Sequence, residues 1–194
     1  DSVGVFGSSV PDITPNIDKL ARDGLRFDLA HVQVANCMPS RNVMWSGRFP
    51  QSNKVEGFYQ VRDPGYPTLT DLAKKAGYFT AIRHKLKDST PYYPYAWDMV
   101  LDDLSGGVKL STKDPESYGL STTQGIRSAK SAGKPFYLLI NIADPHIPFV
   151  GLNRVGREVE DVFPPSRLYA APDISVPGFL TDDPIVRQEL AHYY

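Results

Sequence analysis

The run FYLLINI at residues 136–142 decides how this sequence is predicted to fold. It is apolar almost throughout, which is typical of a central parallel strand covered on both faces. A polar helical stretch around residues 121–130 precedes it, and Gly133 provides a turn between the two. Helix followed by strand is the order found in α/β proteins. We therefore expect an α/β fold, with a mostly parallel sheet flanked by helices.

The same order occurs nearer the N-terminus. Residues 67–76 predict an amphipathic helix with Leu69 and Leu72 on its apolar face, and residues 78–82 predict the strand that follows. A Pro- and Gly-rich stretch at about 144–180 predicts a long irregular excursion. Three further helices are expected, at 14–24, from about Ser40 and from Asp183, and Gly24 is expected to end the first of them in a left-handed conformation. Residues 25–29 predict one half-buried strand.

The composition is that of a folded globular chain. Of 194 residues, 41% are hydrophobic and 22% are charged, which excludes intrinsic disorder, a collagen-like repeat and a miniprotein built on disulfides. Lys plus Arg (21) and Asp plus Glu (22) nearly cancel, so no basic field points to nucleic acid, and no apolar run could span a bilayer. We expect neither a nucleic-acid nor a membrane partner. The sequence predicts no compartment and no oligomeric state.

Three polar clusters follow predicted strands. They occupy residues 37–41, 83–87 and 144–148. Because open parallel sheets bind ligands at the carboxyl ends of their strands, we expect these clusters to converge on one crevice.

The first cluster, CMPSR at residues 37–41, contains the only cysteine of the chain. Cys37 stands at the start of a predicted helix beside Arg41, and both a helix N-terminus and a guanidinium favour a bound anion. From the residues alone, two interpretations stay open: a reactive anion site, or a buried structural cysteine beside a surface arginine. A tyrosine-phosphatase-like loop is disfavoured because Val43 stands where that loop has its arginine.

The pattern Cys37-x-Pro39-Ser40-Arg41 resembles the signature of the formylglycine-dependent sulfatases, which belong to the alkaline phosphatase superfamily. The later Pro-rich run through Ser166 and Val176-Pro177, with the helix that ends in AHYY at 191–194, looks most similar to the sulfamidase branch. The resemblance implies an alkaline-phosphatase-like sheet, of which residues 1–194 would be an internal part of the catalytic domain, without the first strand and the C-terminal part. Other segments similar to that family follow in order: TPNIDKL at 14–20, GLRF at 24–27, SGRFP at 46–50, YPTL at 66–69, AGYFTA at 76–81 and ADPHIPF at 143–149.

The resemblance also implies a chemistry. In the family the motif cysteine is oxidised to formylglycine, whose hydrate supplies the oxygen nucleophile that attacks the sulfur of a sulfate ester or sulfamate, and Cys37 is the matching residue. Arg41 would hold the hydrated aldehyde, Lys85 would contact the sulfate, and His146 would protonate the leaving oxygen or nitrogen. The implied substrate is a sulfated small molecule or glycan.

Two departures from the family pattern concern turnover and metal. The family has Gly-Lys-x-His where this chain has His84-Lys85-Leu86-Lys87, so Lys87 replaces the histidine that acts on the formylglycine hydroxyl. We count Lys87 among the substrate-binding residues, with Lys85 and His146. The resemblance implies Ca²⁺, bound in part by residue 37 as formylglycine, but the carboxylate ligands of the family have no counterparts in this chain.

Several alternatives stay open at this point. A phosphonate monoester hydrolase or phosphodiesterase shares the cysteine signature, and a non-catalytic anion-binding protein would fit the change at Lys87. Lys85 could belong to a solvated basic loop instead of a site. Asp144 could orient His146 or only cap the following turn. His31 and His192 receive no role.

Overall fold

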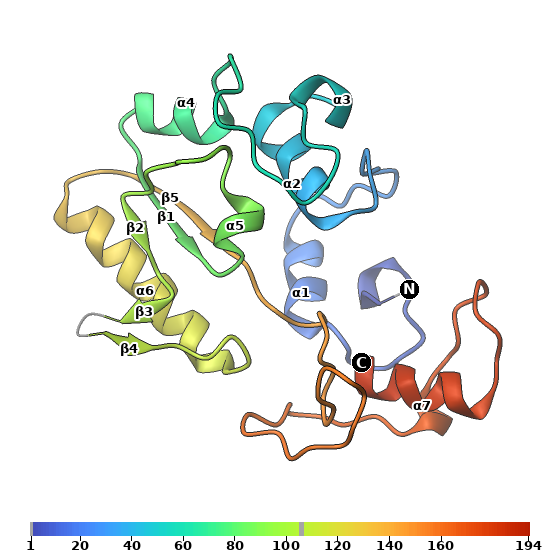
Figure 1. Ribbon diagram of the computed structural model, residues 1–194. Coiled ribbons are helices and arrows are strands. Elements are labelled where there is room, and N and C mark those ends of the chain that lie inside the picture. The colour runs from blue at the N-terminus through green and yellow to red at the C-terminus, as the bar shows by residue number, and fades with distance from the viewer. Residues whose placement is uncertain (1, 105–106) are drawn as a thin grey trace. The chain divides into compact units, whose positions relative to one another are not determined.

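The computed structural model describes residues 2–104 and 107–194 (Figure 1). The chain divides into two compact units. One consists of Asp1–Ala30 together with Asp144–Tyr194, and the other of His31–Ala143. No described helix is both long and apolar enough to cross a membrane.

The unit His31–Ala143 contains the parallel sheet that the sequence predicts. Strand β1 (Phe79–Arg83) pairs in parallel with β5 (Phe136–Ile140), and on its other side with β2 (Met99–Val100), so the strand order is β2-β1-β5. The prediction of a parallel sheet flanked by helices is thereby confirmed. The other elements of this unit are α2 (Cys37–Ser46), α3 (Pro50–Asn53), α4 (Leu69–Lys75), α5 (Leu86–Ser89), α6 (Pro115–Ser131) and the antiparallel pair β3 (Asp103–Leu104) and β4 (Val108–Lys109).

The central strand of the described sheet is β1, so the prediction of a central strand at 136–142 is wrong. Ala81 and Ile82 of β1 are 0% exposed, whereas Phe136 of β5 is 50% exposed. Apolar composition expresses a preference for burial, but a strand becomes central only when other strands pair with both of its edges. Among the described residues, β5 pairs with β1 alone.

Helix α6 packs against β5 through small residues. A Cβ added at Gly125 would lie 3.1 Å from side-chain carbons of Leu101 and Leu138, and Ser121 and Ala129 on the same face are also buried. The helix begins after Asp114, whose side chain accepts a hydrogen bond from the Glu116 N–H. The absence of a side chain at Gly125 therefore allows the close approach of helix and sheet.

Helix α4 is formed as predicted, but its apolar face is exposed. Thr68 and Asp71 form a capping box at its start. Leu69 is 48% and Leu72 is 49% exposed, and the buried residue of the helix is Thr70. Both leucines are thus only half buried, and their expected burial is wrong for the described residues.

The unit of Asp1–Ala30 and Asp144–Tyr194 is largely irregular. Helix α1 (Pro15–Asp23) is formed as predicted, and α7 (Pro184–Tyr193) begins after Asp183, whose carboxylate accepts from the N–H groups of the first turn. Between Asp144 and Asp183 the regular elements are a short 3₁₀ helix, η2 (Ala171–Asp173), and one antiparallel bridge from Leu152 to Glu158. A second 3₁₀ helix, η1, spans Gly4–Phe6.

Two local predictions in this unit are wrong. Gly24 ends α1 in an extended conformation with φ −129°, not in the left-handed one. Residues 25–29 form no strand, and Leu25 and Leu29 are 80% and 84% exposed. Alternating apolar residues become a strand only where another strand accepts and donates their backbone hydrogen bonds, and no described strand does so here.

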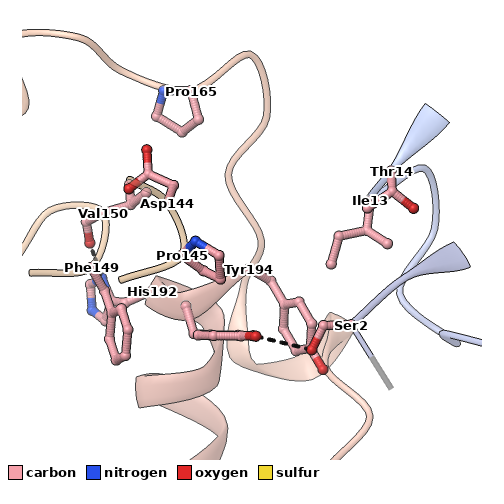
Figure 2. Close-up of a pocket in the computed structure, with 11 residues that line it drawn as sticks. Ser2, Ile13, Thr14, Asp144, Pro145, Phe149, Val150, Pro165, His192 and Tyr194 are labelled. Carbon is pink, nitrogen blue, oxygen red and sulfur yellow. Dashed lines mark hydrogen bonds between the residues drawn. The ribbon is translucent and has the colours of Figure 1, made fainter. Parts of the chain in front are cut away.

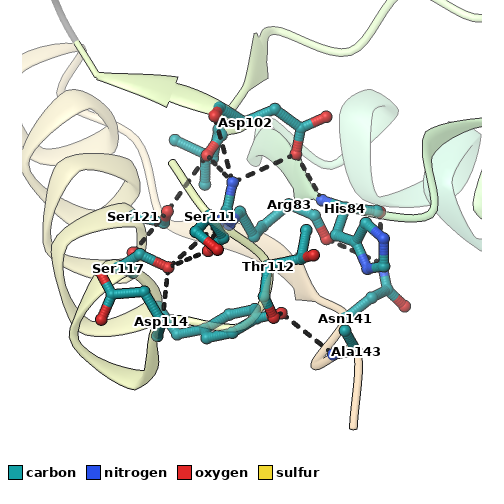
Figure 3. Close-up of polar contacts among 12 residues, drawn as sticks. Arg83, His84, Asp102, Ser111, Thr112, Asp114, Ser117, Ser121, Asn141 and Ala143 are labelled. Carbon is teal, nitrogen blue, oxygen red and sulfur yellow. Dashed lines mark hydrogen bonds and ion pairs between the residues drawn. The ribbon is translucent and has the colours of Figure 1, made fainter. Parts of the chain in front are cut away.

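Arg83 ends β1 as a buried cation and not as part of a solvated basic loop (Figure 3). It is 1% exposed, and its guanidinium carbon lies 5.1 Å from the ring centroid of Tyr118. The acceptors of its N–H groups come from several segments that follow β1, at 3.1–3.4 Å: the carbonyls of Leu101, Asp102 and Ser111 and the hydroxyl of Ser117. One side chain thus connects the end of β1 to the β2–β3 segment and to α6.

Replacing Arg83 should therefore destabilise the unit strongly. We expect Arg83→Met to lower the free energy of unfolding by about 2 to 4 kcal/mol, because several buried acceptors lose their donor at once. Arg127→Met, at an exposed arginine of α6, is the matched control and should change it by less than about 0.5 kcal/mol. Urea unfolding measures both values, and equal losses in the two variants would contradict the structural role of Arg83.

Candidate active site

Cys37 lies at a helix N-terminus, as expected, but it is the first residue of α2, so the helix begins about three residues before the predicted start near Ser40. Asn36 precedes it in an extended conformation, and Gly47 ends the helix with φ 62° by donating its N–H to the Val43 carbonyl. Cys37 is a half-buried free thiol. With Arg41 and Ser40 it lines an open cavity of about 480 Å³.

Arg41 lies one helical turn after Cys37 and contacts its sulfur. Its Nε donates to Cys37 Sγ at 3.4 Å, and its Nη1 donates to Ser89 Oγ at 2.8 Å and to Asn141 Oδ1 at 2.6 Å. The spacing of four residues places both side chains on one face of α2. The guanidinium is therefore fixed beside the thiol by α5 and by the residue that follows β5.

Asn141 determines where Arg41 points. It follows β5 directly, is 7% exposed, and donates from Nδ2 to the carbonyls of Arg83 and His84 at 3.1 and 3.0 Å. Because both amide protons are used at the end of β1, the amide oxygen is left to accept from Arg41. Asn141 thus positions the cation that adjoins Cys37.

The turn from β1 into α5 has an unusual backbone. His84 and Lys85 are consecutive left-handed residues, with φ 57° and 52°. Side chains other than glycine rarely adopt this conformation, and the sulfatase pattern quoted above has glycine where this chain has His84. The His84 N–H donates to Asp102 Oδ1 at 2.6 Å, a charge-assisted bond that holds the turn.

The two lysines of this cluster lie in different surroundings. Lys85 is half-buried, and its Nζ lies 3.6 Å from Asp88 Oδ2, so it belongs to an ion pair and not to a fully solvated loop. Lys87 is exposed and lines another cavity, with Gln60 and Arg62. The described contacts of Cys37 do not include Lys87.

His146 belongs to the unit of Asp1–Ala30 and Asp144–Tyr194, whereas Cys37, Arg41 and Lys85 belong to His31–Ala143. Its Nδ1 lies 2.9 Å from the Ile147 carbonyl oxygen. The convergence of all four residues on a single cavity stays a prediction.

A cavity of about 270 Å³ adjoins the segment that contains His146 (Figure 2). Asp144 and Pro145 line it, together with His192 of α7, whose Nδ1 lies 2.7 Å from the Val150 carbonyl oxygen. His192 is thus held by the backbone of the excursion, and we assign it no chemical role.

The described residues around Cys37 do not fit a calcium site. Calcium takes six to eight oxygen ligands, mostly carboxylates and carbonyls. The neighbour of the Cys37 sulfur is instead the Arg41 cation, which also occupies the Asn141 oxygen. Among the described residues, no three His, Cys, Asp or Glu side chains gather as metal ligands. We therefore derive no step that passes through a metal.

Comparison with known proteins identifies the family of this site. The sulfatase family profile matches residues 1–171, so the chain belongs to the sulfatase family. Its fold class is accordingly the alkaline-phosphatase-like one that the sequence resemblance implies. The chain is 27% identical to iduronate 2-sulfatase of Mus musculus over 215 residues, which cover 92% of this chain and 38% of that protein.

Two further relatives agree with this assignment. Arylsulfatase K of Xenopus laevis is 38% identical over 151 residues (68% of this chain and 28% of that protein), and an ulvan-active sulfatase of Formosa agariphila is 29% identical over 134 residues (69% and 25%). The chain therefore spans well under half the length of these relatives. The finer likeness to the sulfamidase branch stays a prediction.

Three residues of this site were not predicted from the sequence: Asn141, Ser89 and Asp102. A signal existed for Asn141, because it is the polar residue that interrupts the apolar run FYLLINI at the carboxyl end of the strand. Ser89, the last residue of α5, and Asp102, between β2 and β3, are marked by no comparable pattern. They reach the site only because the chain folds back between β1 and β5.

Asn141 allows a direct test of this arrangement. We expect Asn141→Ala to lower the free energy of unfolding by about 1 to 3 kcal/mol, because the carbonyls of Arg83 and His84 and the Arg41 guanidinium lose a buried partner. Gln51→Ala removes an exposed amide in the same unit and should be nearly neutral. Urea unfolding of both variants provides the measurement, and an unchanged midpoint for Asn141→Ala would contradict the positioning role.

His84 provides a pH-dependent test. Burial lowers its pKa below the ordinary value of 6.5; Lys85 and Arg83 lower it further, while Asp102 and a hydrogen bond with Asn141 oppose the shift. The unfolded chain therefore takes up the proton first, and this group's contribution to stability is lost as the pH falls below about 6.5.

We expect His84→Asn to reduce the loss of stability between about pH 7 and pH 5, since asparagine does not titrate and tolerates the left-handed backbone. His31→Asn, at an exposed histidine of the same unit, is the control and should keep the pH dependence of the unmodified protein. Thermal melting across this pH range gives the comparison. Parallel curves for His84→Asn and the unmodified protein would contradict the assignment.

Proposed function

We propose that this chain carries the nucleophile of a sulfatase that hydrolyses a sulfate ester or sulfamate through a formylglycine made from Cys37. The observation that supports it is the 3.4 Å contact from Arg41 Nε to Cys37 Sγ, with Nη1 held by Ser89 and Asn141. A structural cysteine does not require a guanidinium fixed from two other segments. An anionic reaction centre requires a cation that is fixed in place.

The role of Arg41 follows from this geometry. A formylglycine at residue 37 supplies, once hydrated, the oxygen that attacks sulfur. Arg41 donates toward the side chain at position 37, and its guanidinium cannot swing away while Nη1 remains bound to Ser89 and Asn141. A donor that is already oriented stabilises developing negative charge without reorganisation during the reaction.

Lys85 and His146 complete the proposal. Lys85 contributes a positive charge toward the sulfate oxygens, which requires its ammonium to exchange its partner Asp88 for the substrate. His146 protonates the leaving oxygen or nitrogen, a step for which imidazole is suited near neutral pH. The substrate we propose is a sulfated carbohydrate, because two of the relatives are sulfatases named for iduronate and ulvan.

A second candidate is a protein that binds sulfated ligands without turnover. It is favoured by one observation: Lys87, which replaces the histidine of the family pattern, lines a cavity other than that of Cys37. A phosphonate monoester hydrolase or phosphodiesterase would keep the same cysteine chemistry and is distinguished by its substrate.

The mass of the peptide that contains Cys37 tests the proposal first. We expect the mass of an aldehyde in place of a thiol when the protein that carries this sequence is produced together with a formylglycine-generating enzyme. An unmodified thiol under those conditions would contradict the proposed nucleophile. Aryl sulfate and aryl phosphate with one leaving group then separate the reactions, and faster release from the phosphate would favour the phosphodiesterase alternative.

Removal of the nucleophile is the decisive variant. We expect Cys37→Ala to lower the rate of sulfate release by on the order of 10³-fold or more while leaving the melting temperature nearly unchanged. Lys134→Gln, at an exposed lysine ahead of β5, should leave the rate unchanged. Undiminished turnover in Cys37→Ala would refute the mechanism, and a modified Cys37 without any turnover would favour the non-catalytic candidate.

A further inference from the structure

A second cavity of the His31–Ala143 unit lies beside α5 and has a volume of about 580 Å³. Its walls come from the loop around Gln60, from α5 and from the loop around Tyr93. We call it the α5 cavity. Its lining includes two cations, three aromatic or hydroxyl side chains and no carboxylate: Gln60, Arg62, Leu86, Lys87, Thr90, Tyr93, Pro94 and Tyr95.

The two loops are fixed by hydrogen bonds. Gln60 Nε2 donates to the Lys87 carbonyl at 3.0 Å, and the Tyr93 N–H donates to the Val61 carbonyl at 2.9 Å. These bonds join one loop to α5 and the two loops to each other. The cavity is therefore preformed, which lowers the entropy cost of binding a ligand.

The charge of the α5 cavity is uncompensated. Arg62 and Lys87 are both exposed, and neither forms an ion pair within the described part of the chain. The whole chain has a formal charge of −1, so two free cations in one concavity are a local feature. Such a concavity concentrates anions.

The remaining lining residues indicate what else the ligand contains. Tyr93 is 54% exposed, and the Arg62 guanidinium carbon lies 6.0 Å from its ring centroid, so an aromatic surface and a cation are presented together. Gln60 keeps its amide oxygen as an acceptor for a hydroxyl group. A ligand that contacts the two cations, the Tyr93 ring and the Gln60 amide oxygen carries an anionic group, an apolar face and hydroxyl groups. This combination is the chemistry of an acidic sugar.

Helix α5, a single helical turn, contributes residues both to this cavity and to the Cys37 site. Ser89 accepts from Arg41 Nη1 at 2.8 Å, while Leu86 and Lys87 of the same helix line the α5 cavity. We propose that the α5 cavity binds a second, acidic sugar unit of the substrate, through its carboxylate or sulfate, next to the unit whose sulfate reacts. This inference rests on the proposed function, and it gives Lys87 a role in binding in place of the histidine of the family pattern.

Binding of small sugars to the purified protein tests this inference. The probes are glucuronate, glucose 6-sulfate, uncharged glucose and inorganic sulfate, followed by calorimetry at low salt. We expect both charged sugars to bind at least about 10-fold more tightly than glucose and than inorganic sulfate, because only they engage the cations and the aromatic surface together.

Variants locate the binding. We expect Arg62→Gln and Lys87→Gln each to weaken glucuronate binding by about 5- to 10-fold, and Tyr93→Ala to weaken it as well. All three residues are exposed, so the variants should fold, which melting temperatures verify. Lys134→Gln is the control for general surface charge and should leave the affinity unchanged.

Several outcomes would overturn the inference. Equal affinity for glucose and glucuronate would show that charge is not recognised, and equal affinity for inorganic sulfate would reduce the cavity to a simple anion site. Weaker binding in Lys134→Gln to the same extent as in Arg62→Gln would indicate general electrostatics. Displacement of glucuronate by a short oligonucleotide that itself binds more tightly would assign the cavity to another ligand class.

The test is independent of the reaction. Glucuronate has no sulfate for the Cys37 site, so Cys37→Ala should bind it with unchanged affinity. If turnover fails in the unmodified protein but selective glucuronate binding persists, the proposed function is wrong and the sugar site stands. If turnover is observed without selective binding, the proposed function stands and the sugar site is wrong.

Discussion

A buried positive charge at the end of β1 is the constraint on which the Cys37 site depends. The Arg83 side chain gathers the segments that follow β1 around a single guanidinium (Figure 3). Its backbone carbonyl accepts from Asn141, and Asn141 in turn fixes Arg41 beside Cys37. Since a buried cation must be paired with acceptors, these segments cannot separate without exposing or orphaning it. The geometry at the thiol therefore follows from a residue that does not touch it.

The turn at His84 and Lys85 carries a side chain where the sulfatase pattern quoted above has glycine. A left-handed backbone is natural for glycine and strained for other residues. Here the Asp102 carboxylate holds the turn by accepting a hydrogen bond from the His84 N–H. Burial lowers the pKa of the His84 imidazole, so its protonation at acidic pH lowers the free energy of unfolding. His84 thus couples the stability of this turn to pH.

Helix α5 contributes residues to both of the sites that we propose for this unit. Ser89 faces the guanidinium of the Cys37 site, whereas Lys87 faces the α5 cavity. In our proposal this single turn holds the Arg41 guanidinium on one side and contributes to the recognition of a neighbouring sugar on the other. The family pattern quoted above has a histidine at the position of Lys87, and in this chain we propose that Lys87 binds the substrate.

The sequence by itself determined the helix–strand order, the place of Cys37 near the start of a helix with Arg41 one turn further on, and the family. These are properties of short segments, set by apolar periodicity, helix signals and a local motif. Only the tertiary structure decided that β1 is the central strand, that Arg83 is buried, and that Asn141 and Ser89 hold Arg41. Those facts depend on which segments pair across 48 and 100 residues of chain, and no local pattern encodes that pairing.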